Sequence, residues 1–262
     1  MQVLFVGDVV AHPGKRMIKN QLKTLLSEKK VDVCVVNAEN VAAGLGVNAA
    51  SVKDIFSAGA DCITLGNHSF SCPDFFRMAE SEPRIVRPGN VSSSWPGFGE
   101  HLIDLKEKGR LLVVSLMGQV FVTPIPNSPF EFFEANIQRW KDEYKPTNIL
   151  MDFHAETTSE KGAMAYMADG RVSLVLGTHT HVQTADEKIL PRGTGFISDV
   201  GMTGTPDGIL GMDPDASLRR LGEKLPARYM PCDGPAMLNA ILADLDITNG
   251  KCLTIERINI HE

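Results

Sequence analysis

The chain of 262 residues is long enough to bury one large core or two smaller ones. Its 43% hydrophobic and 22% charged residues are ordinary for a globular enzyme, and its formal net charge of −6 gives no general attraction to DNA, RNA or anionic membranes. These values argue against a long nucleic-acid duplex or a membrane surface as the main partner. A small phosphorylated molecule held by metal ions stays open.

The cysteines and the N-terminal residues indicate a cytoplasmic protein. The chain starts with the strand-like stretch Gln2–Val6, without a basic leader or cleavage site, and no apolar run approaches membrane-spanning length. The cysteines are odd in number, scattered and free of C-x-x-C pairs, which predicts a reducing compartment. They are Cys34, Cys62, Cys72, Cys232 and Cys252.

Strand and helix patterns alternate in the first third of the chain. Buried strands are expected at 3–8, 31–36 and 62–65, with helices at 14–30 and from a cap at Asn48 or Ser51 to residue 58. Such alternation predicts βαβ units, a largely parallel sheet and an α/β fold. In these sheets ligands bind outside the carboxyl ends of the strands.

The rest of the chain adds two hairpins to this pattern. Strands at 101–105 and 111–116 form one hairpin, and strands at 236–247 and 251–260 form the other around Asn249-Gly250. Between them we expect helices at 127–140, 159–168 and 213–222, and strands at 148–153, 173–177 and 195–199. We therefore predict one domain, 1–262, with a second sheet built from the middle and C-terminal hairpins.

Metal-capable side chains follow the predicted strands. Gly177 leads into His179 and His181, whose i, i+2 spacing brings two imidazoles into one small volume, whether the strand continues or ends there. Each such residue alone could be a turn, cap, core or surface residue. Eight at equivalent positions favour a joint site: Asp8, Glu39, Asn40, Asn67, His68, His154, His179 and His181.

Mixed carboxylate, amide and imidazole donors suit Mn, Fe or Zn, and argue against a cysteine-rich structural zinc site. The donors outnumber what one ion needs, which favours two metal ions. A carboxylate such as Glu39 can bridge ions about 3.5–4 Å apart, and such a pair activates water and clamps phosphate oxygens. The metal charge then replaces Arg and Lys at a phosphate site, so an acidic protein can act on a phosphorylated substrate.

Gly7-Asp8, Gly66-Asn67-His68 and Gly177–His181 resemble the signature of calcineurin-like metallophosphoesterases. The chain departs from that signature at Val10, 37–40, Ser69 and Thr178. With these departures it is similar to a narrower branch, the YmdB-type bacterial phosphodiesterases. Further blocks similar to that branch are 87–90, 152–156, 158–161, 181–186 and 199–204.

The resemblance implies a four-layer α/β/β/α sandwich of two mixed sheets with a dinuclear site between them. It implies hydrolysis of 2′,3′-cyclic nucleotides and model phosphodiesters, with iron as the metal and manganese or zinc as alternatives. His68 matches the proton donor to the leaving oxygen. The ligand sets implied are Asp8, Asn40 and His181 for one ion, Asn67, His154 and His179 for the other, and Glu39 as the bridge.

Other readings remain open from the sequence. The same fold could serve as a regulatory or RNA-associated metal-binding protein with incidental hydrolysis, with RNA ends or short RNA as partners. A β-lactamase-fold hydrolase is set aside, because Val182-Gln183-Thr184 follow His181 where an H-x-H-x-D-H block is needed. A homo-oligomer is also an option. Candidates for residues that support the metal ligands from behind are Asp199, Thr178 and Thr180. Candidates for the rim of the substrate pocket are Arg87, Lys161 and Phe70.

Overall fold

Two six-stranded sheets face each other in the computed structural model, which describes residues 1–262. In spatial order the first sheet contains β12 (Cys252–His261), β11 (Met237–Leu245), β1 (Gln2–Val6), β2 (Val33–Asn37), β3 (Cys62–Thr64) and β4 (Ile85–Val86). The second contains β5 (Glu100–Asp104), β6 (Arg110–Met117), β7 (Asn148–His154), β8 (Leu174–Thr178), β10 (Gly195–Ile197) and β9 (Lys188–Ile189). Strands β1 to β4 are parallel, as are β6, β7, β8 and β10.

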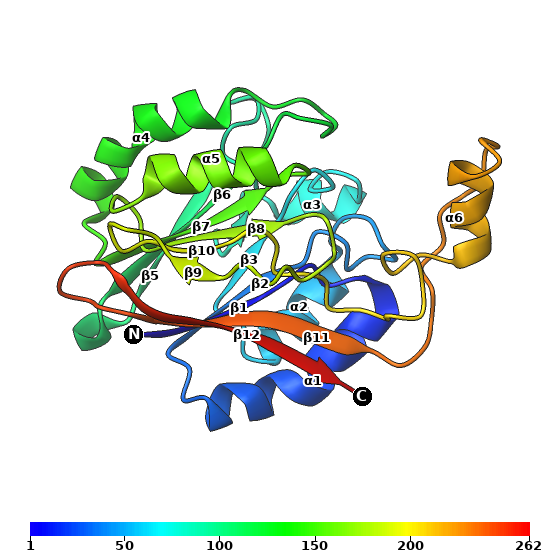
Figure 1. Cartoon of the computed structure of the whole chain (residues 1–262), viewed down its shortest axis with the longest axis horizontal. Helices are drawn as coiled ribbons and strands as arrows, with labels where there is room; N and C mark the ends of the chain where they lie inside the picture. The colour runs from blue at the N-terminus through cyan, green and yellow to red at the C-terminus, as the bar shows by residue number, and fades with distance from the viewer.

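Helices cover the outer faces of both sheets (Figure 1). The first sheet carries α1 (Ala11–Glu28), α2 (Ala49–Ser57) and α3 (Pro73–Met78), and the second carries α4 (Pro129–Tyr144) and α5 (Thr158–Ala168). A 3₁₀ turn, η1 (Lys106–Lys108), joins β5 to β6, and α6 (Pro214–Leu221) projects from one end of the molecule. The predicted α/β class and α/β/β/α layering are confirmed. No helix has the length and apolar character needed to cross a bilayer.

Alternating side chains of the central strands build two separate cores. Along β1, Leu4 and Val6 join the cluster under α1 and α2, whereas Val3 and Phe5 join the cluster between the sheets. All four side chains are at most 1% exposed. This period-2 division explains why the strand reads as a continuous apolar run rather than as an alternating one.

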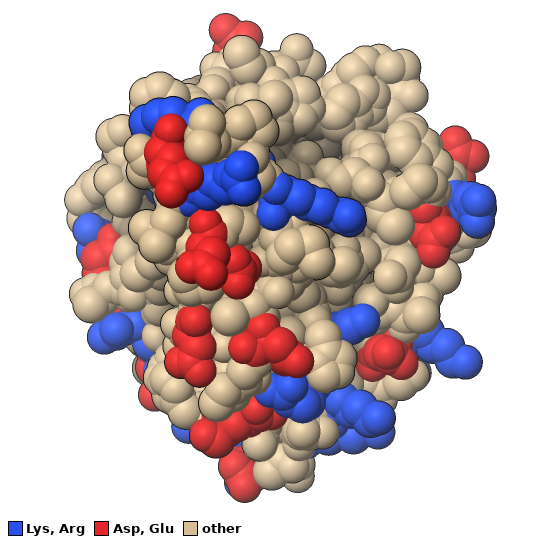
Figure 2. Space-filling view, turned by 90° about the vertical axis from the view of Figure 1, so that its right-hand side faces the viewer, with Lys and Arg blue, Asp and Glu red and all other residues tan.

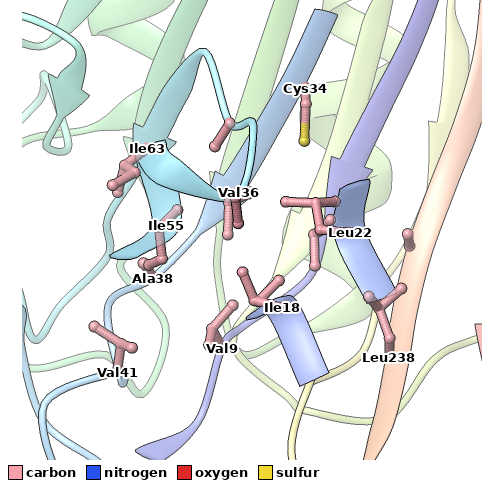
Figure 3. Packing of buried hydrophobic residues seen from close by; sticks show 14 of the residues in the cluster. Val9, Ile18, Leu22, Cys34, Val36, Ala38, Val41, Ile55, Ile63 and Leu238 are labelled. Atoms are coloured by element: carbon pink, nitrogen blue, oxygen red, sulfur yellow. The ribbon is translucent and has the colours of Figure 1, made fainter. Parts of the chain in front are cut away.

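The outer core fixes α1 and α2 on the first sheet. Figure 3 shows Ile18 and Leu22 of α1 beside Val36 of β2 and Leu238 of β11. The expected cap of α2 is confirmed, since the Asn48 side chain accepts a 2.8 Å hydrogen bond from the Ser51 amide. These contacts set where β1 and β2 end, and therefore where the following loops meet.

The C-terminal hairpin does not belong to the second sheet, so that prediction is wrong. Strand β11 pairs antiparallel with β1, with Phe5 opposite Ile241 and Leu4 opposite Leu242. Because β1 is buried on both faces, it needs a neighbour on each edge with apolar side chains on both faces, and β11 supplies them. The Asn-Gly turn signals the β11–β12 pairing but carries no information about which sheet receives the pair. The middle hairpin, β5–β6, does lie in the second sheet.

Candidate metal centre

The carboxyl ends of strands from both sheets meet at one edge of the sandwich. The eight side chains singled out above all lie there, and the first four in the following order are at most 3% exposed. They are Asp8 after β1, Glu39 and Asn40 after β2, His154 at the end of β7, Asn67 and His68 after β3, and His179 and His181 after β8.

Glu39, His154 and His179 form the centre of this cluster. One oxygen of Glu39, Oε1, lies 3.2 Å from His154 Nε2, and His179 Nδ1 lies 3.0 Å from the same nitrogen. The donor atoms of the three side chains all lie within 4.8 Å of one another. One carboxylate and two imidazoles this close form a set that a first-row metal ion can use.

The amide side chains of Asn40 and Asn67 each contact a different part of this centre. The Asn40 amide nitrogen lies 3.0 Å from Glu39 Oε1 and 3.2 Å from His181 Nε2. On the other side, Asn67 Oδ1 lies 2.9 Å from His154 Nε2. The donors therefore fall into two groups, with Glu39 between them.

The His154 ring is held from behind by a buried hydrogen-bond chain. Its Nδ1 lies 2.9 Å from Thr178 Oγ1, and the Thr178 hydroxyl donates to Asp152 Oδ1 at 2.7 Å. The second oxygen of Asp152 accepts from Asn37 and Thr64. Since the Thr178 proton is used on Asp152, Thr178 accepts from His154 Nδ1–H, and Nε2 is the nitrogen that faces the centre.

In His179 and His181, too, one ring nitrogen contacts a partner outside the cluster. His179 Nε2 lies 3.1 Å from a carboxylate oxygen of Glu156, and His181 Nδ1 donates to the Leu210 carbonyl at 2.9 Å. In all three rings one nitrogen therefore contacts a protein partner while the other faces the cluster. Sequence reasoning missed both partners. Glu156 follows His154 by two residues, a weak signal, and Leu210 contributes only its backbone.

The loop that carries His179 and His181 has an unusual backbone. Strand β8 ends at Thr178, so both histidines lie in the following loop, with φ of 102° and 66°. Positive φ at a residue other than glycine costs free energy and persists where surrounding contacts enforce it. Gly177 lies inside the strand, where a Cβ would be only 1.8 Å from the Ser198 carbonyl oxygen.

A buried ion pair enforces this loop conformation. Asp199 Oδ2 accepts from Lys161 Nζ at 2.7 Å and from the Thr180 amide, between the two histidines, at 2.9 Å. Both charged side chains are 1% exposed. The supporting role expected of Asp199 thus has a physical basis, and Thr180 acts through its backbone. Lys161 is part of this support and does not lie on the rim.

The charged groups of the cluster strongly affect one another. Burial raises the pKa of Asp8 to about 7, although His181 and His154 oppose the shift. Burial also acts to raise the pKa of Glu39, but the nearby His154 and His68 outweigh it and hold that pKa below its usual value. Conversely, Glu39 outweighs burial at His154 and raises its pKa to about 9. The centre thus favours positive charge next to Glu39.

Asp8 provides a direct test of whether a metal ion fits here. Its Oδ2 accepts from the His179 amide at 3.2 Å, but Oδ1 is buried without a hydrogen-bond partner. An unpartnered buried carboxylate oxygen is costly unless a cation contacts it. The residues present therefore fit a metal site built from oxygen and nitrogen donors.

His68 differs from the other histidines because its ring is not part of the Glu39–His154–His179 centre. Its backbone amide donates to Glu39 Oε2 at 3.1 Å, and its Nδ1 lies 3.4 Å from the hydroxyl of Ser71. Ser69, which stands where the metallophosphoesterase motif that the chain resembles has an acid, donates to the Gly66 carbonyl. Burial lowers the pKa of His68, while the charge of Glu39 opposes that shift.

Like Lys161, the other two expected rim residues, Arg87 and Phe70, have structural roles. Arg87 is buried, and its guanidinium donates to three backbone carbonyls, those of Pro88, Trp95 and Pro96. Phe70 packs edge-on against Trp95 with ring centroids 4.6 Å apart. The expectation that Arg87 lines the rim is wrong, because an isolated Arg before Pro gives no indication of whether its charge faces solvent.

We expect Gly66→Ala to disrupt the centre. A Cβ at this position would lie 2.3 Å from His154 Cδ2 and 2.4 Å from Glu39 Oε2, so one of the two side chains must move. The variant should lose metal content and about 1–3 kcal/mol of stability. Gly162→Ala in α5 is the matched control, because nothing lies within 4 Å of its Cβ position. Equal metal content in both variants, by elemental analysis, would contradict this account.

Comparisons with known proteins agree with this architecture. Residues 4–258 match the model of a family described as YmdB-like protein. The chain is 40% identical over its full length to a Bacillus subtilis protein named 2′,3′-cyclic-nucleotide 2′-phosphodiesterase, of which it covers 98%. It is 32% identical to a putative phosphatase/phosphodiesterase of Mycoplasma pneumoniae, covering 100% of this chain and 94% of that protein.

Two solved structures share the whole fold. A hypothetical protein from Thermus thermophilus superposes with a TM-score of 0.93 at 36% identity, covering both chains completely. A protein from Mycoplasma pneumoniae, described as a novel phosphatase, superposes with a TM-score of 0.93 at 32% identity, covering 100% of this chain and 93% of the other. Since the family model and these relatives span nearly the entire sequence, the chain belongs to the YmdB-like protein family.

Proposed function

We propose that this protein is a metal-dependent phosphodiesterase that hydrolyses 2′,3′-cyclic nucleotides. The main support is that three imidazoles each have one nitrogen on a protein partner and the other on a residue of the donor cluster, which is Glu39 for His154, His154 for His179 and Asn40 for His181. The name of the Bacillus subtilis relative, at 40% identity over the full chain, supports the substrate class.

Two metal ions fit the two groups of donors. Asp8, Asn40 and His181 would hold one ion, Asn67, His154 and His179 the other, with Glu39 as the shared ligand. When bound, such ions lower the pKa of a water molecule and neutralise charge on the phosphate. The donor types suit iron, with manganese and zinc as alternatives.

His68 would supply the proton that the reaction requires. Hydrolysis adds water across the P–O2′ bond, so phosphorus gains a hydroxyl and the leaving O2′ gains a proton, giving a nucleoside 3′-phosphate. The His68 ring lies beside the donor cluster without belonging to it, and its neighbour Ser71 can orient it. A positioned imidazole is a common proton donor to a departing alkoxide.

A substrate panel tests this function. Protein reloaded separately with iron, manganese or zinc is assayed on 2′,3′-cyclic AMP, bis(p-nitrophenyl) phosphate and p-nitrophenyl phosphate. We expect conversion of the cyclic nucleotide to the 3′-phosphate and slower hydrolysis of the monoester. Hydrolysis of the monoester alone would contradict the proposal. Metal binding with no hydrolysis at all would favour the regulatory alternative.

Because both sheets share a core and both contribute donors, we propose that residues 1–262 act as one domain. All five cysteines are free thiols, which supports a reducing compartment such as the cytoplasm.

A further inference from the structure

Residues 213–230 form an arm that leaves the body of the protein. Helix α6 lies in this arm and projects at the right-hand end of the molecule (Figure 1). Two contacts close its base: the Asp213 amide donates to the Met230 carbonyl at 2.8 Å, and Met212 pairs with Pro231 in an isolated β-bridge. The chain therefore leaves and re-enters the body of the protein at one point. We call this base of the arm, with its flanking residues 210–212 and 231, the stem.

The stem of the arm lies against the metal centre. The carbonyl of Leu210, three residues before the arm, accepts the hydrogen bond from His181 Nδ1. On the other side of the stem, Pro231 Cγ lies 3.2 Å from the Cβ position of Gly44, in the loop that follows Asn40. The base of the arm is thus adjacent to two of the loops that carry the proposed metal ligands.

The arm is cationic although the protein as a whole is acidic. Within 213–230 there are four basic residues, Arg219, Arg220, Lys224 and Arg228, against the three acids Asp213, Asp215 and Glu223, in a chain of net charge −6. All four basic side chains are exposed and none forms an ion pair within the chain. Figure 2 shows this end of the molecule, with Lys and Arg side chains beside a hollow in the surface and Asp and Glu side chains next to them.

Aromatic and apolar groups lie among these charges. The Arg220 guanidinium lies 4.2 Å from the centroid of the Tyr229 ring, and Tyr229 is 39% exposed. Leu218 and Leu221 are each 58% exposed. Unpaired cations next to an exposed aromatic ring are the combination that binds single-stranded nucleic acid, through phosphates and stacked bases.

We propose that the arm binds the 3′-terminal nucleotides of a single-stranded RNA whose terminal 2′,3′-cyclic phosphate is hydrolysed at the metal centre. This inference rests on the proposed function. A 2′,3′-cyclic phosphate requires a ribose, and an RNA 3′ end presents the same ring as the mononucleotide with further phosphates attached. A second copy of this chain is a poorer occupant, because a two-fold contact through the arm would bring two cationic surfaces together.

The test compares a mononucleotide with RNA. Wild-type holoenzyme is assayed on 2′,3′-cyclic AMP and on a ten-nucleotide RNA that ends in a 2′,3′-cyclic phosphate, alongside Arg219→Glu/Lys224→Glu. We expect the variant to lose on the order of tenfold in kcat/KM for the RNA at low salt, while the mononucleotide changes less than about twofold. Lys19→Glu/Lys23→Glu on α1 is the control, because it makes the same charge change at two exposed lysines of another element.

Salt dependence gives an independent readout. Each phosphate contact contributes about 0.7 to the slope of log affinity against log salt for a single strand, so losing two contacts should lower the slope by about 1.4. Binding of an RNA with a 3′-phosphate, followed by fluorescence anisotropy, measures this even if no substrate is hydrolysed. Failure of the proposed function is thereby separated from failure of this inference.

Two results would overturn the inference. One is that the arm variant loses as much kcat/KM for the mononucleotide as for the RNA, or that the α1 control variant loses as much for the RNA as the arm variant does. The other is a dimer that the arm variant abolishes while RNA affinity and its salt slope stay unchanged, which would assign the arm to a second copy.

Discussion

Glu39→Gln is expected to lose bound metal and nearly all turnover of 2′,3′-cyclic AMP. Glu39 is 1% exposed, its Oε1 lies between Asn40 and His154, and its Oε2 accepts from the His68 amide. Glutamine keeps the shape but removes the charge that the centre needs. The loss should exceed the roughly 10–100-fold typical of residues that only support a ligand.

Glu100→Gln is the control for this variant. Glu100 is a partly buried carboxylate paired with Arg139 at 2.6 Å, and it lies on β5 at the edge of the second sheet. It should keep full metal content and activity. Metal content is measured by elemental analysis and turnover by product formation. Full activity of Glu39→Gln with unchanged metal would falsify the proposed mechanism.

His68→Ala is expected to keep its metal and lose turnover by about 10²–10⁴-fold, the range for a general acid. Its ring contacts Asn67 and Ser71 only at 3.4 Å, so removing it leaves the other donors in place. The loss should be much smaller with bis(p-nitrophenyl) phosphate, because p-nitrophenolate leaves without a proton.

His101→Ala on β5 controls for removal of a half-buried histidine outside the site. It should leave both substrates unaffected. If His68→Ala reduced hydrolysis of both substrates equally, or lost metal together with activity, His68 would be a ligand or a structural residue rather than the proton donor.

The strand ends could be predicted because each has a local signal. A buried apolar run that stops at Gly7-Asp8 or Gly66-Asn67-His68 indicates both the strand and the loop that follows it. Parallel pairing then brings the loops after β1, β2 and β3 together in the first sheet, and those after β7 and β8 together in the second. The resemblance to a known family supplied the expectation that the two sets face each other. For this reason the candidate metal ligands and His68 lie at one edge, as expected from the sequence.

The contacts behind the donors could not be predicted in the same way. His181 is oriented by the carbonyl of Leu210, 29 residues away, and any side chain could occupy that position. Lys161 looked available for a substrate, but its burial against Asp199 depends on how α5 packs on β8. Such pairings are properties of the tertiary structure, and a single sequence has no periodic or motif signal for them.

The wrong prediction of the sheet that holds the C-terminal hairpin has a similar cause. The Asn249-Gly250 turn fixes how β11 and β12 pair with each other, but the choice between two sheet edges depends on which strand lacks a neighbour. Strand β1 was that strand, and only the assembled sheet shows it.

Metal titration tests the central claim most directly. Protein stripped with a chelator is reloaded stepwise with iron, manganese or zinc, and turnover of 2′,3′-cyclic AMP is measured against ions bound per chain. The proposed centre predicts no turnover without metal and a plateau at about two ions per chain. A plateau at one ion, or turnover that persists in the stripped protein, would contradict it.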